Sequence, residues 1–246
     1  MKVIAITQAR VGSSRLPGKV LKKINAKSLL EIHIQRVLKS KHLDKIIVAT
    51  TVEPDAIEIC SICDQIGVSY FRGSLENVLD RFYQTAKNEQ PDYVVRLTSD
   101  CPLIDSSIID EIIQTCIEGK YDYVSNTLKP TYPDGMDVEV FKFSALETAW
   151  KEATLQSEKE HVTPYIWKNS SFYEGSLFKS FSIELDHDYS EYRLTVDEQK
   201  DFELINYLIE HIGDDKSWNK YVEYLNEHPD LLKINSSIKR NEGYIK

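Results

Sequence analysis

Cysteine is scarce in this chain, which has only four cysteines in 246 residues. Secreted domains that depend on disulfides are rich in cysteine, so the scarcity argues against that class. Cys60 and Cys63 have the CxxC spacing of some zinc and redox sites, but no second pair accompanies them. Together with Ile59 and Ile66 they recur at helical spacing, which predicts that both cysteines face a core.

Long apolar runs are also missing. No stretch approaches the roughly 20 residues that span a bilayer, and the first residues lack an apolar region followed by a small-residue cleavage site. We therefore expect a cytoplasmic protein without a membrane segment. Basic residues are outnumbered by acidic ones, 30 against 39, which gives a net charge of −9. This charge disfavours nonspecific binding to nucleic acid or anionic lipid, so neither is expected as a partner.

What the chain does contain is an alternation of short apolar strands with amphipathic helices. Near-continuous apolar strands in such an alternation predict a largely parallel sheet covered on both faces, a three-layer α/β/α, Rossmann-like fold. The length suits one large core, so we expect one domain over 1–212, with an inserted segment around 121–185, and a helical appendage over 213–246. The expected strands are 3–7, 46–50, 68–71, 93–97, 121–125, 137–141 and 192–196, and the expected helices are 28–38, 55–66, 76–87, 106–118, 158–167 and 198–212.

A basic loop follows the first strand, from Gln8 to Lys19. It combines three cations with two glycines and two serines. Glycine makes backbone N–H groups accessible to phosphate oxygens, arginine offers a bidentate fork and lysine a mobile point charge. The spacing of Gly12 and Gly18 fits neither a Walker loop nor a dinucleotide fingerprint. The residues predict a polyphosphate site, and a solvated basic turn is the alternative.

Two aspartates follow expected buried strands. Asp100 follows 93–97 and Asp197 follows 192–196. Ligands bind beyond the carboxyl ends of strands in open α/β sheets, and carboxylates suit Mg²⁺. The alternative for each aspartate is a helix cap, and for Asp105, directly before the helix expected at 106–118, the cap is the preferred interpretation.

The loop resembles that of cytidylyltransferases that activate sugar acids, in which Ala-Arg is followed by Ser, Leu-Pro and Lys. The resemblance is strongest to the spore-coat polysaccharide (SpsF-like) branch, and it extends over nearly the whole chain. The further matching segments are 71–74, 78–83, 95–105, 132–141, 160–165 and 194–197.

This resemblance implies a nucleotide-diphospho-sugar transferase-like fold, CTP as nucleotide and Mg²⁺ or Mn²⁺ as cofactor. It implies that the loop holds the triphosphate, that Arg15, Lys19 and Asp100 act in catalysis, and that Asp100 and Asp197 approach the metal. A related branch has a further aspartate where Thr195 stands, so the number of metals stays open. The implied nucleotide-binding residues are Gln8, Ala9, Arg10, Gly12, Ser13, Ser14, Arg15, Lys19, Arg72, Asp80 and Arg96.

The acceptor is expected to bind near a loop over the site. Pro133-Asp134-Gly135 explains itself as a chain reversal, but Asp137 and Glu139 would share one face of a strand. They could bind sugar hydroxyls or assist the attacking oxygen, and a structural role is the alternative for each. The full set of expected acceptor residues is Tyr132, Asp134, Asp137, Glu139 and His161.

The sequence therefore predicts transfer of CMP from CTP to a sugar acid or related sugar, with release of pyrophosphate, for surface polysaccharide synthesis. The acceptor is a sugar acid or sugar phosphate, and the resemblance implies a homodimer. Positioned cations and a divalent metal would offset charge on the reacting phosphate. One alternative is a metal-dependent glycosyltransferase, for which only Asp186-His187-Asp188 has the Asp-x-Asp spacing. The other is a nucleotide-binding protein without turnover.

Overall fold

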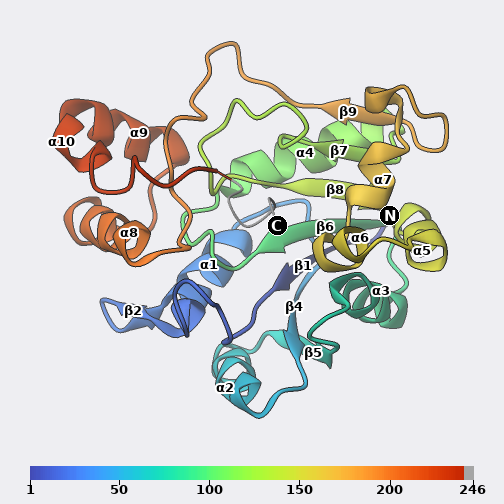
Figure 1. The fold of residues 1–246 in the computed structure, drawn as a ribbon, viewed down its shortest axis with the longest axis horizontal. Helices are drawn as coiled ribbons and strands as arrows, with labels where there is room; N and C mark the ends of the chain where they lie inside the picture. Colours follow the sequence, from blue (N-terminus) through green and yellow to red (C-terminus); the bar gives the residue numbers. More distant parts are fainter. Residues whose placement is uncertain (241–246) are drawn as a thin grey trace.

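In the computed structural model, which describes residues 1–240, seven strands form one mixed sheet in the order β5-β4-β1-β6-β8-β7-β9 (Figure 1). Neighbours among β5, β4, β1 and β6 are parallel. β8 runs antiparallel to both β6 and β7, and β9 is parallel to β7. The strands are β1 (Val3–Gln8), β4 (Lys45–Thr51), β5 (Ser69–Gly73), β6 (Tyr93–Thr98), β7 (Tyr123–Ser125), β8 (Glu139–Lys142) and β9 (Ser180–Ser182), and a hairpin of β2 (Lys23–Ile24) and β3 (Lys27–Ser28) stands apart.

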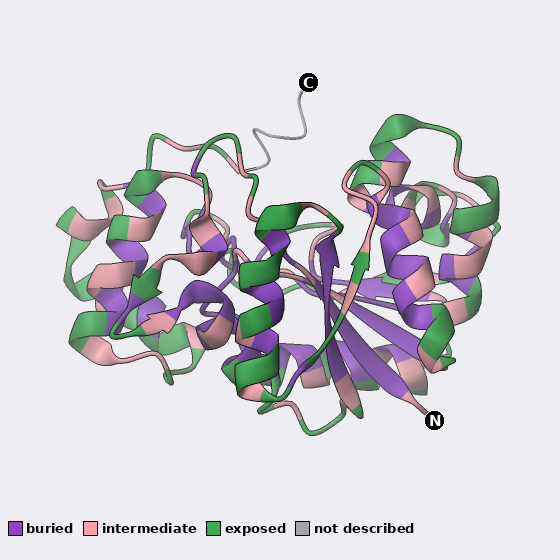
Figure 2. Ribbon diagram, turned by 90° about the horizontal axis from the view of Figure 1, so that it is seen from below, coloured by how far each residue is buried: buried purple, intermediate pink, exposed green. Residues whose placement is uncertain are grey.

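Helices cover both faces of this sheet, and their buried sides face the strands (Figure 2). One core cluster packs α1, α2, α4, α8 and α9 on one face, and a second packs α3, α5 and α7 on the other. The predicted three-layer, mostly parallel fold is confirmed. The helices are α1 (Leu29–Val37), α2 (Ile57–Ile66), α3 (Val78–Glu89), α4 (Ser106–Glu118), α5 (Phe143–Glu152), α6 (Gln156–His161), α7 (Pro164–Lys168), α8 (Gln199–Ile212), α9 (Trp218–Glu227) and α10 (Pro229–Leu232).

Short-range signals fix the helix starts. Ser28 caps α1 in a capping box with Glu31. Asp105 caps α4 by accepting a hydrogen bond from the Ser107 N–H, so the capping role preferred for this residue is confirmed. Cys60 and Cys63 lie buried and free on α2, as the helical spacing predicted.

The C-terminal part packs into the same core as the sheet. Tyr221, Val222 and Leu225 of α9 are buried in the cluster that covers α1 and α4. The last residues of the expected appendage, 241–246, lie outside the described residues. None of the helices in residues 1–240 combines the length and the apolar composition that a bilayer crossing requires.

The prediction of a regular strand at 192–196 is wrong. The segment makes only an isolated bridge, between Arg193 and Asp134. Its backbone N–H groups bond to two different loops, from Leu194 to the Asp134 carbonyl and from Val196 to the Asp100 carbonyl. The segment therefore ties the loop after β6 to the loop before β8, at the edge where β1, β4 and β6 end.

Candidate active site

The basic loop after β1 is folded by its own backbone. The N–H groups of Ser13 and Gly18 both donate to the Val11 carbonyl, over 2.8 and 2.9 Å. Gly18 has φ 67°, in the left-handed region that glycine adopts without a steric cost. This turn starts a short 3₁₀ helix at Lys19. Arg10, Gly12, Ser14 and Arg15 remain exposed along the loop, whereas Lys19 is directed inward.

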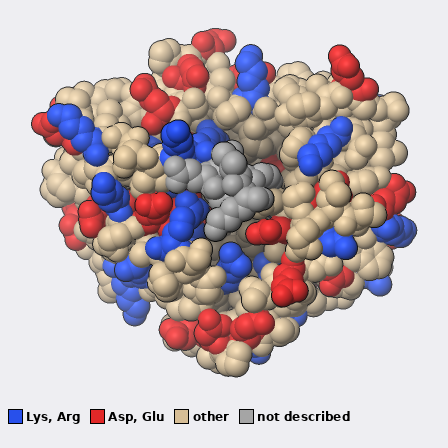
Figure 3. Space-filling model, in the orientation of Figure 1, with Lys and Arg blue, Asp and Glu red and all other residues tan. Residues whose placement is uncertain are grey.

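Lys19 joins the two aspartates that the sequence singled out. Its Nζ lies 2.7 Å from Asp100 Oδ2 and 2.8 Å from Asp197 Oδ1. A second cation reaches the same carboxylate, since Arg15 lies 2.9 Å from Asp197 Oδ1. Figure 3 shows Lys and Arg side chains beside Asp and Glu side chains around the middle of this face. Lys19 thus meets residues 81 and 178 positions away, at the carboxyl edge of the sheet.

The ion pair of Lys19 with Asp100 stays charged at neutral pH. Burial by itself would raise the pKa of Asp100, but the ion pair and hydrogen bond from Lys19 lower that pKa to about 2. For Lys19 burial acts to lower the pKa, and Asp100 and Asp197 outweigh it, so the pKa is raised. Lys19 and Asp100 therefore face each other charged at neutral pH.

The two carboxylates suit a magnesium ion. Both carboxylates contact the Lys19 ammonium, so a cation at this position is stabilised by Asp100 and Asp197 together. Mg²⁺ is usually held by one or two carboxylates together with phosphate oxygens and water. Within residues 1–240 no group of three or more His, Cys, Asp or Glu side chains could hold a metal by itself. Asp100 and Asp197 fit a metal whose remaining ligands would be phosphate oxygens and water.

A buried ion cluster around Arg193 holds the Asp197 carboxylate in place. Arg193 donates to Asp197 over 2.9 Å, to Asp134 over 2.6 Å and to Asp201 over 2.9 Å. Gly135 permits the close approach, because a Cβ there would lie 2.6 Å from the backbone carbon of Leu194. Asp134, expected to bind the acceptor, thus has Arg193 as its nearest partner.

Asp201 is the fully buried member of this cluster, and its removal is expected to destabilise the fold. It accepts from Arg193, from Asn235 and from the backbone N–H groups of Asp197 and Glu198. Burial would raise its pKa, but Arg193 and these donors lower it. Its stabilisation is therefore present above the unfolded pKa of about 4 and lost as the pH falls through the lower folded value.

Asp201→Ala would leave Arg193 short of a buried partner, at an expected cost of about 3–5 kcal/mol. At about 2–4 °C per kcal/mol, thermal unfolding followed by circular dichroism should detect this as a lower Tm. The control is Asp230→Ala, whose exposed ion pair with Lys233 should contribute nothing measurable. Equal Tm values for the two variants would contradict the structural role of Asp201.

On the β8 side a second pair of charges borders the site. Arg96 of β6 forms an ion pair with Glu139 of β8, which also accepts from the Tyr123 hydroxyl over 2.6 Å. Arg96 lies 3.4 Å from the Gln8 side-chain oxygen at the end of β1. Burial lowers the pKa of His161, on which the charges of Arg96 and Glu139 also act. The structure thus brings four expected site residues, Gln8, Arg96, Glu139 and His161, to one region.

Asp137 and Tyr132 contact Arg240 with different groups, Asp137 with its side chain and Tyr132 with its backbone carbonyl. The Asp137 carboxylate lies 2.5 Å from Arg240, near the end of the described chain. Tyr132 has its side chain in the core, where the ring packs 5.8 Å from that of Trp218 and the hydroxyl reaches Glu111. Only the Tyr132 carbonyl faces Arg240, at 3.3 Å.

The expected nucleotide residues on the β4–β5 side have backbone partners. Arg72 donates to the carbonyls of Thr51, Val52 and Glu53, at the end of β4. Asp80 accepts from Trp150 Nε1 over 2.8 Å and from Gln84 over 3.1 Å. In the described chain these bonds make Arg72 a brace of the β4 end and place Asp80 on the α5 side of α3.

Sequence reasoning missed a buried histidine beneath the site. His33 of α1 lies 3.0 Å from the Thr7 hydroxyl and 2.9 Å from the Cys101 carbonyl. Because a carbonyl only accepts, Nδ1 carries the proton and Nε2 accepts from Thr7. Burial lowers the pKa of His33 to about 4, so the ring stays neutral. It supports the turn that presents Asp100, a role that its place on an apolar helix face does not reveal.

Arg193 and Arg240 were missed as well. Arg193 stands directly before the Leu194–Asp197 segment, and a lone arginine among buried positions is a signal that could have found it. Arg240 has no comparable signal. It meets Asp137 across 103 positions of the chain.

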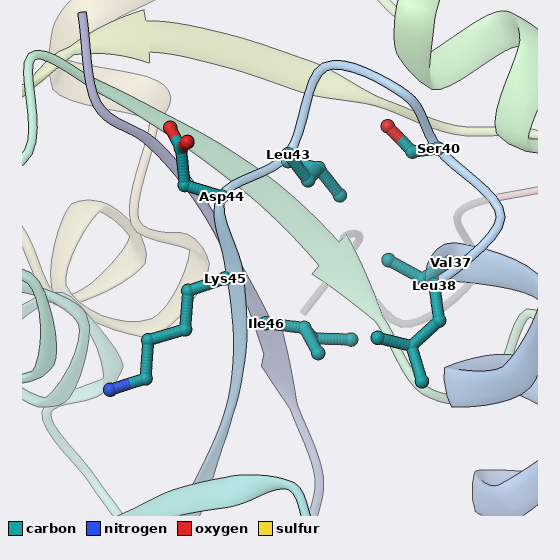
Figure 4. A pocket seen from close by; sticks show the side chains of 7 residues that line it. All are labelled: Val37, Leu38, Ser40, Leu43, Asp44, Lys45 and Ile46. Atoms are coloured by element: carbon teal, nitrogen blue, oxygen red, sulfur yellow. The ribbon is translucent and has the colours of Figure 1, made fainter.

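A small apolar pocket elsewhere has no part in this site. It lies at the start of β4, where Val37, Leu38, Leu43 and Ile46 line it, while Lys45 points away (Figure 4). The Lys19–Asp100–Asp197 cluster lies at the opposite edge of the sheet, where the parallel strands end. The chemistry-bearing residues therefore gather away from this pocket.

Comparison with known proteins gives a consistent picture. The model of the cytidylyltransferase family matches residues 4–230. The spore coat polysaccharide biosynthesis protein SpsF of Bacillus subtilis is 33% identical over 240 residues, 93% of this chain and 95% of that protein. The 3-deoxy-manno-octulosonate cytidylyltransferase of Elusimicrobium minutum is 30% identical over 133 residues, 53% of this chain and 52% of that enzyme.

A solved structure agrees over the whole length. A cytidylyltransferase from Leptospira borgpetersenii superposes with a TM-score of 0.89 at 34% identity, covering 98% of this chain and 100% of that one.

Proposed function

This chain belongs to the cytidylyltransferase family, and from that premise we propose that it transfers CMP from CTP to a hydroxyl of a sugar acid. In this reaction the acceptor oxygen attacks the α-phosphorus. The bond from that phosphorus to the bridging oxygen of the β-phosphate breaks, pyrophosphate leaves, and the hydroxyl proton passes to a base. The observation that carries the proposal is the convergence of Lys19 on Asp100 and Asp197 at 2.7 and 2.8 Å, beside a basic loop.

In the proposed assignment the loop holds the triphosphate. The Gly12 backbone N–H, the hydroxyls of Ser13 and Ser14, and the cations of Arg10, Arg15 and Lys19 all lie on it. The Ala9 N–H, also expected to bind nucleotide, instead donates to the Ala49 carbonyl over 3.2 Å. Lys19 and Arg15 both contact Asp197. CTP would offer the two cations phosphate oxygens as alternative partners. The transition state then gains cations that are already in place.

Asp100 and Asp197 would hold Mg²⁺ or Mn²⁺, which offsets charge on the reacting phosphate when it is bound. Arg96 and Gln8 would line the passage from the nucleotide to the acceptor, with Arg72 and Asp80 assigned to the nucleotide side. The acceptor would lie toward β8, against Asp137, Glu139 and His161, with Asp134 and Tyr132 forming the frame behind them.

A pyrophosphate-release screen tests this proposal. Each of the four nucleoside triphosphates is offered with Mg²⁺ and a panel of ulosonic acids and sugar phosphates. CTP with an acid acceptor is expected to support release. Release with UTP or GTP alone would sink the cytidylyl assignment, and tight CTP binding without release for any acceptor would favour a protein without turnover.

The pH profile tests a base role for Asp137. Burial raises the pKa of this carboxyl to about 7, with Asp134 and Glu139 adding to the rise and Arg240 and Arg96 opposing it. A protonated carboxyl cannot accept the acceptor's proton. If Asp137 is the base, kcat/KM should rise about tenfold per pH unit below 7 and level off above it.

Asp137→Asn should remove that inflection and lower the plateau. His161→Asn is the control, because burial lowers the pKa of His161 and its loss should leave an inflection near 7 in place. An unchanged inflection in Asp137→Asn would rule out the assignment.

The inserted segment 121–185 is the proposed dimer contact. Its exposed apolar side chains support this, since such patches mark protein interfaces. They are Trp150, Leu155, Phe172, Tyr173, Leu177 and Phe181. Light scattering on a sizing column measures the molar mass directly.

A further inference from the structure

The end of the described chain returns to the site. After α10 the segment runs toward the start of β8, as the dark red trace shows (Figure 1). Asn235, 3% exposed, anchors it by donating to the Arg193 carbonyl over 3.2 Å and to Asp201 over 3.0 Å. A turn follows, in which the Ile238 N–H donates to the Asn235 carbonyl. The segment is thus fixed to the same ion cluster that holds Asp197.

Arg240 then reaches the acceptor side. One terminal nitrogen lies 2.5 Å from Asp137 Oδ1, the other donates to the Tyr132 carbonyl over 3.3 Å, and Nε lies 3.9 Å from Asp134 Oδ1. The side chain is 17% exposed. A long cationic side chain from the C-terminal segment therefore stands among carboxylates at the place assigned to the acceptor.

The three arginines of this region, Arg96, Arg193 and Arg240, differ in their hydrogen-bond partners. Arg193 gives four hydrogen bonds to Asp134, Asp197 and Asp201. Arg96 is paired with the buried Glu139. Among the described residues Arg240 makes two hydrogen bonds, only one of them to a carboxylate, although a guanidinium carries five N–H donors. Arg240 is also the most exposed of the three side chains, at 17% against 15% for Arg96 and 7% for Arg193, and its partner Asp137 is itself 32% exposed. A ligand can therefore reach its guanidinium.

A sugar acid brings a carboxylate into a region that already contains Asp134, Asp137 and Glu139. Without a cation of its own, that carboxylate would be repelled. Lys19 and Arg15 are assigned to the triphosphate, and Arg193 and Arg96 are held by buried acids. Arg240 offers a planar fork that matches a carboxylate bidentately.

We propose that Arg240 is an acceptor-specificity residue, whose guanidinium binds the carboxylate of the sugar acid and through which the C-terminal segment forms one wall of the acceptor site. This inference rests on the proposed function. It assigns substrate recognition to the last described residue, far in sequence from every other site residue. Asp137 shares the guanidinium and sets its position in the absence of acceptor.

Acid and ester forms of the same sugar provide the test. Pyrophosphate release is measured for wild type, Arg240→Ala and Arg240→Lys with 3-deoxy-manno-octulosonate, N-acetylneuraminate, their methyl esters and a set of sugar phosphates. For the acid that wild type uses best, Arg240→Ala should raise the KM at least tenfold and leave the KM for CTP within twofold. Its preference for acid over ester should fall toward one, and Arg240→Lys should lie between. Lys233→Ala, in the same segment but paired on the surface with Asp230, is the matched control.

Each contrary result has its own meaning. A wild type that uses esters or sugar phosphates as well as acids would overturn the assignment and leave cytidylyl transfer intact. So would an unchanged acid preference in Arg240→Ala. If adding Asp137→Asn to Arg240→Ala restores the preference, Arg240 is only a countercharge, and the proposal is wrong. No CTP-dependent release with any acceptor would refute the proposed function itself, and the inference with it.

Discussion

Replacing Lys19 with alanine is expected to lower CTP-dependent pyrophosphate release by about 10²–10³-fold, the usual effect of losing one positioned donor to developing charge. The side chain is 12% exposed and is held between two aspartates. Its charge is thus held beside the proposed phosphate position, and an exchange of carboxylate for phosphate oxygens would bring it to the nucleotide. A steady-state assay at saturating CTP measures the loss.

The same substitution should act in the opposite direction on metal binding. The Lys19 ammonium lies between Asp100 and Asp197, in the position that a divalent ion would share. Lys19→Ala leaves the two carboxylates without this neighbour, so Mn²⁺ titration without nucleotide should show affinity at least equal to wild type. A misfolded variant would lose both properties.

Lys23→Ala is the control, because Lys23 lies exposed in the hairpin that follows. It should keep both the rate and the metal affinity. A near-normal rate in Lys19→Ala would refute the proposed triphosphate site. A lost rate together with lost metal binding would point to structural damage instead of missing charge.

Much of the fold could be predicted from short-range features of the sequence. The strands that became β1, β4 and β6 are apolar runs buried on both faces, and the helix starts at Ser28 and Asp105 carry their own capping side chains. These signals depend on neighbours in sequence. The position of Asp100 at a strand end followed from the same pattern.

The rest of the site depends on contacts between distant segments. The run Tyr192–Val196 has the residues of a buried strand, yet its backbone bonds to two loops. The ion pair of Arg193 with Asp134 holds the run against one of them. The spacing of apolar residues predicts which positions are buried. It does not predict which loop a segment will bond to. The pair of Asp137 with Arg240 is the extreme case, since nothing near either residue specifies the other.

Asp100→Asn is expected to reduce turnover by about 10²–10⁴-fold, because a metal bound at a reacting phosphate supplies several kcal/mol and each 1.36 kcal/mol is tenfold in rate. The change preserves shape and removes one charge. Lys19 holds the pKa of Asp100 at about 2, so the carboxylate is ionised throughout the working range and pH cannot mimic the substitution. The Mg²⁺ concentration for half-maximal rate should rise as well.

The matched control separates two reaction classes. Asp188 lies exposed in the Asp186-His187-Asp188 segment and accepts from the Ser190 N–H. Asp188→Asn should be silent if the metal binds at Asp100 and Asp197. If instead Asp188→Asn abolished a metal-dependent activity that Asp100→Asn retained, the metal would bind at that late loop. That result would favour a glycosyltransferase, and release of a nucleoside diphosphate from a nucleotide sugar would then replace release of pyrophosphate from CTP.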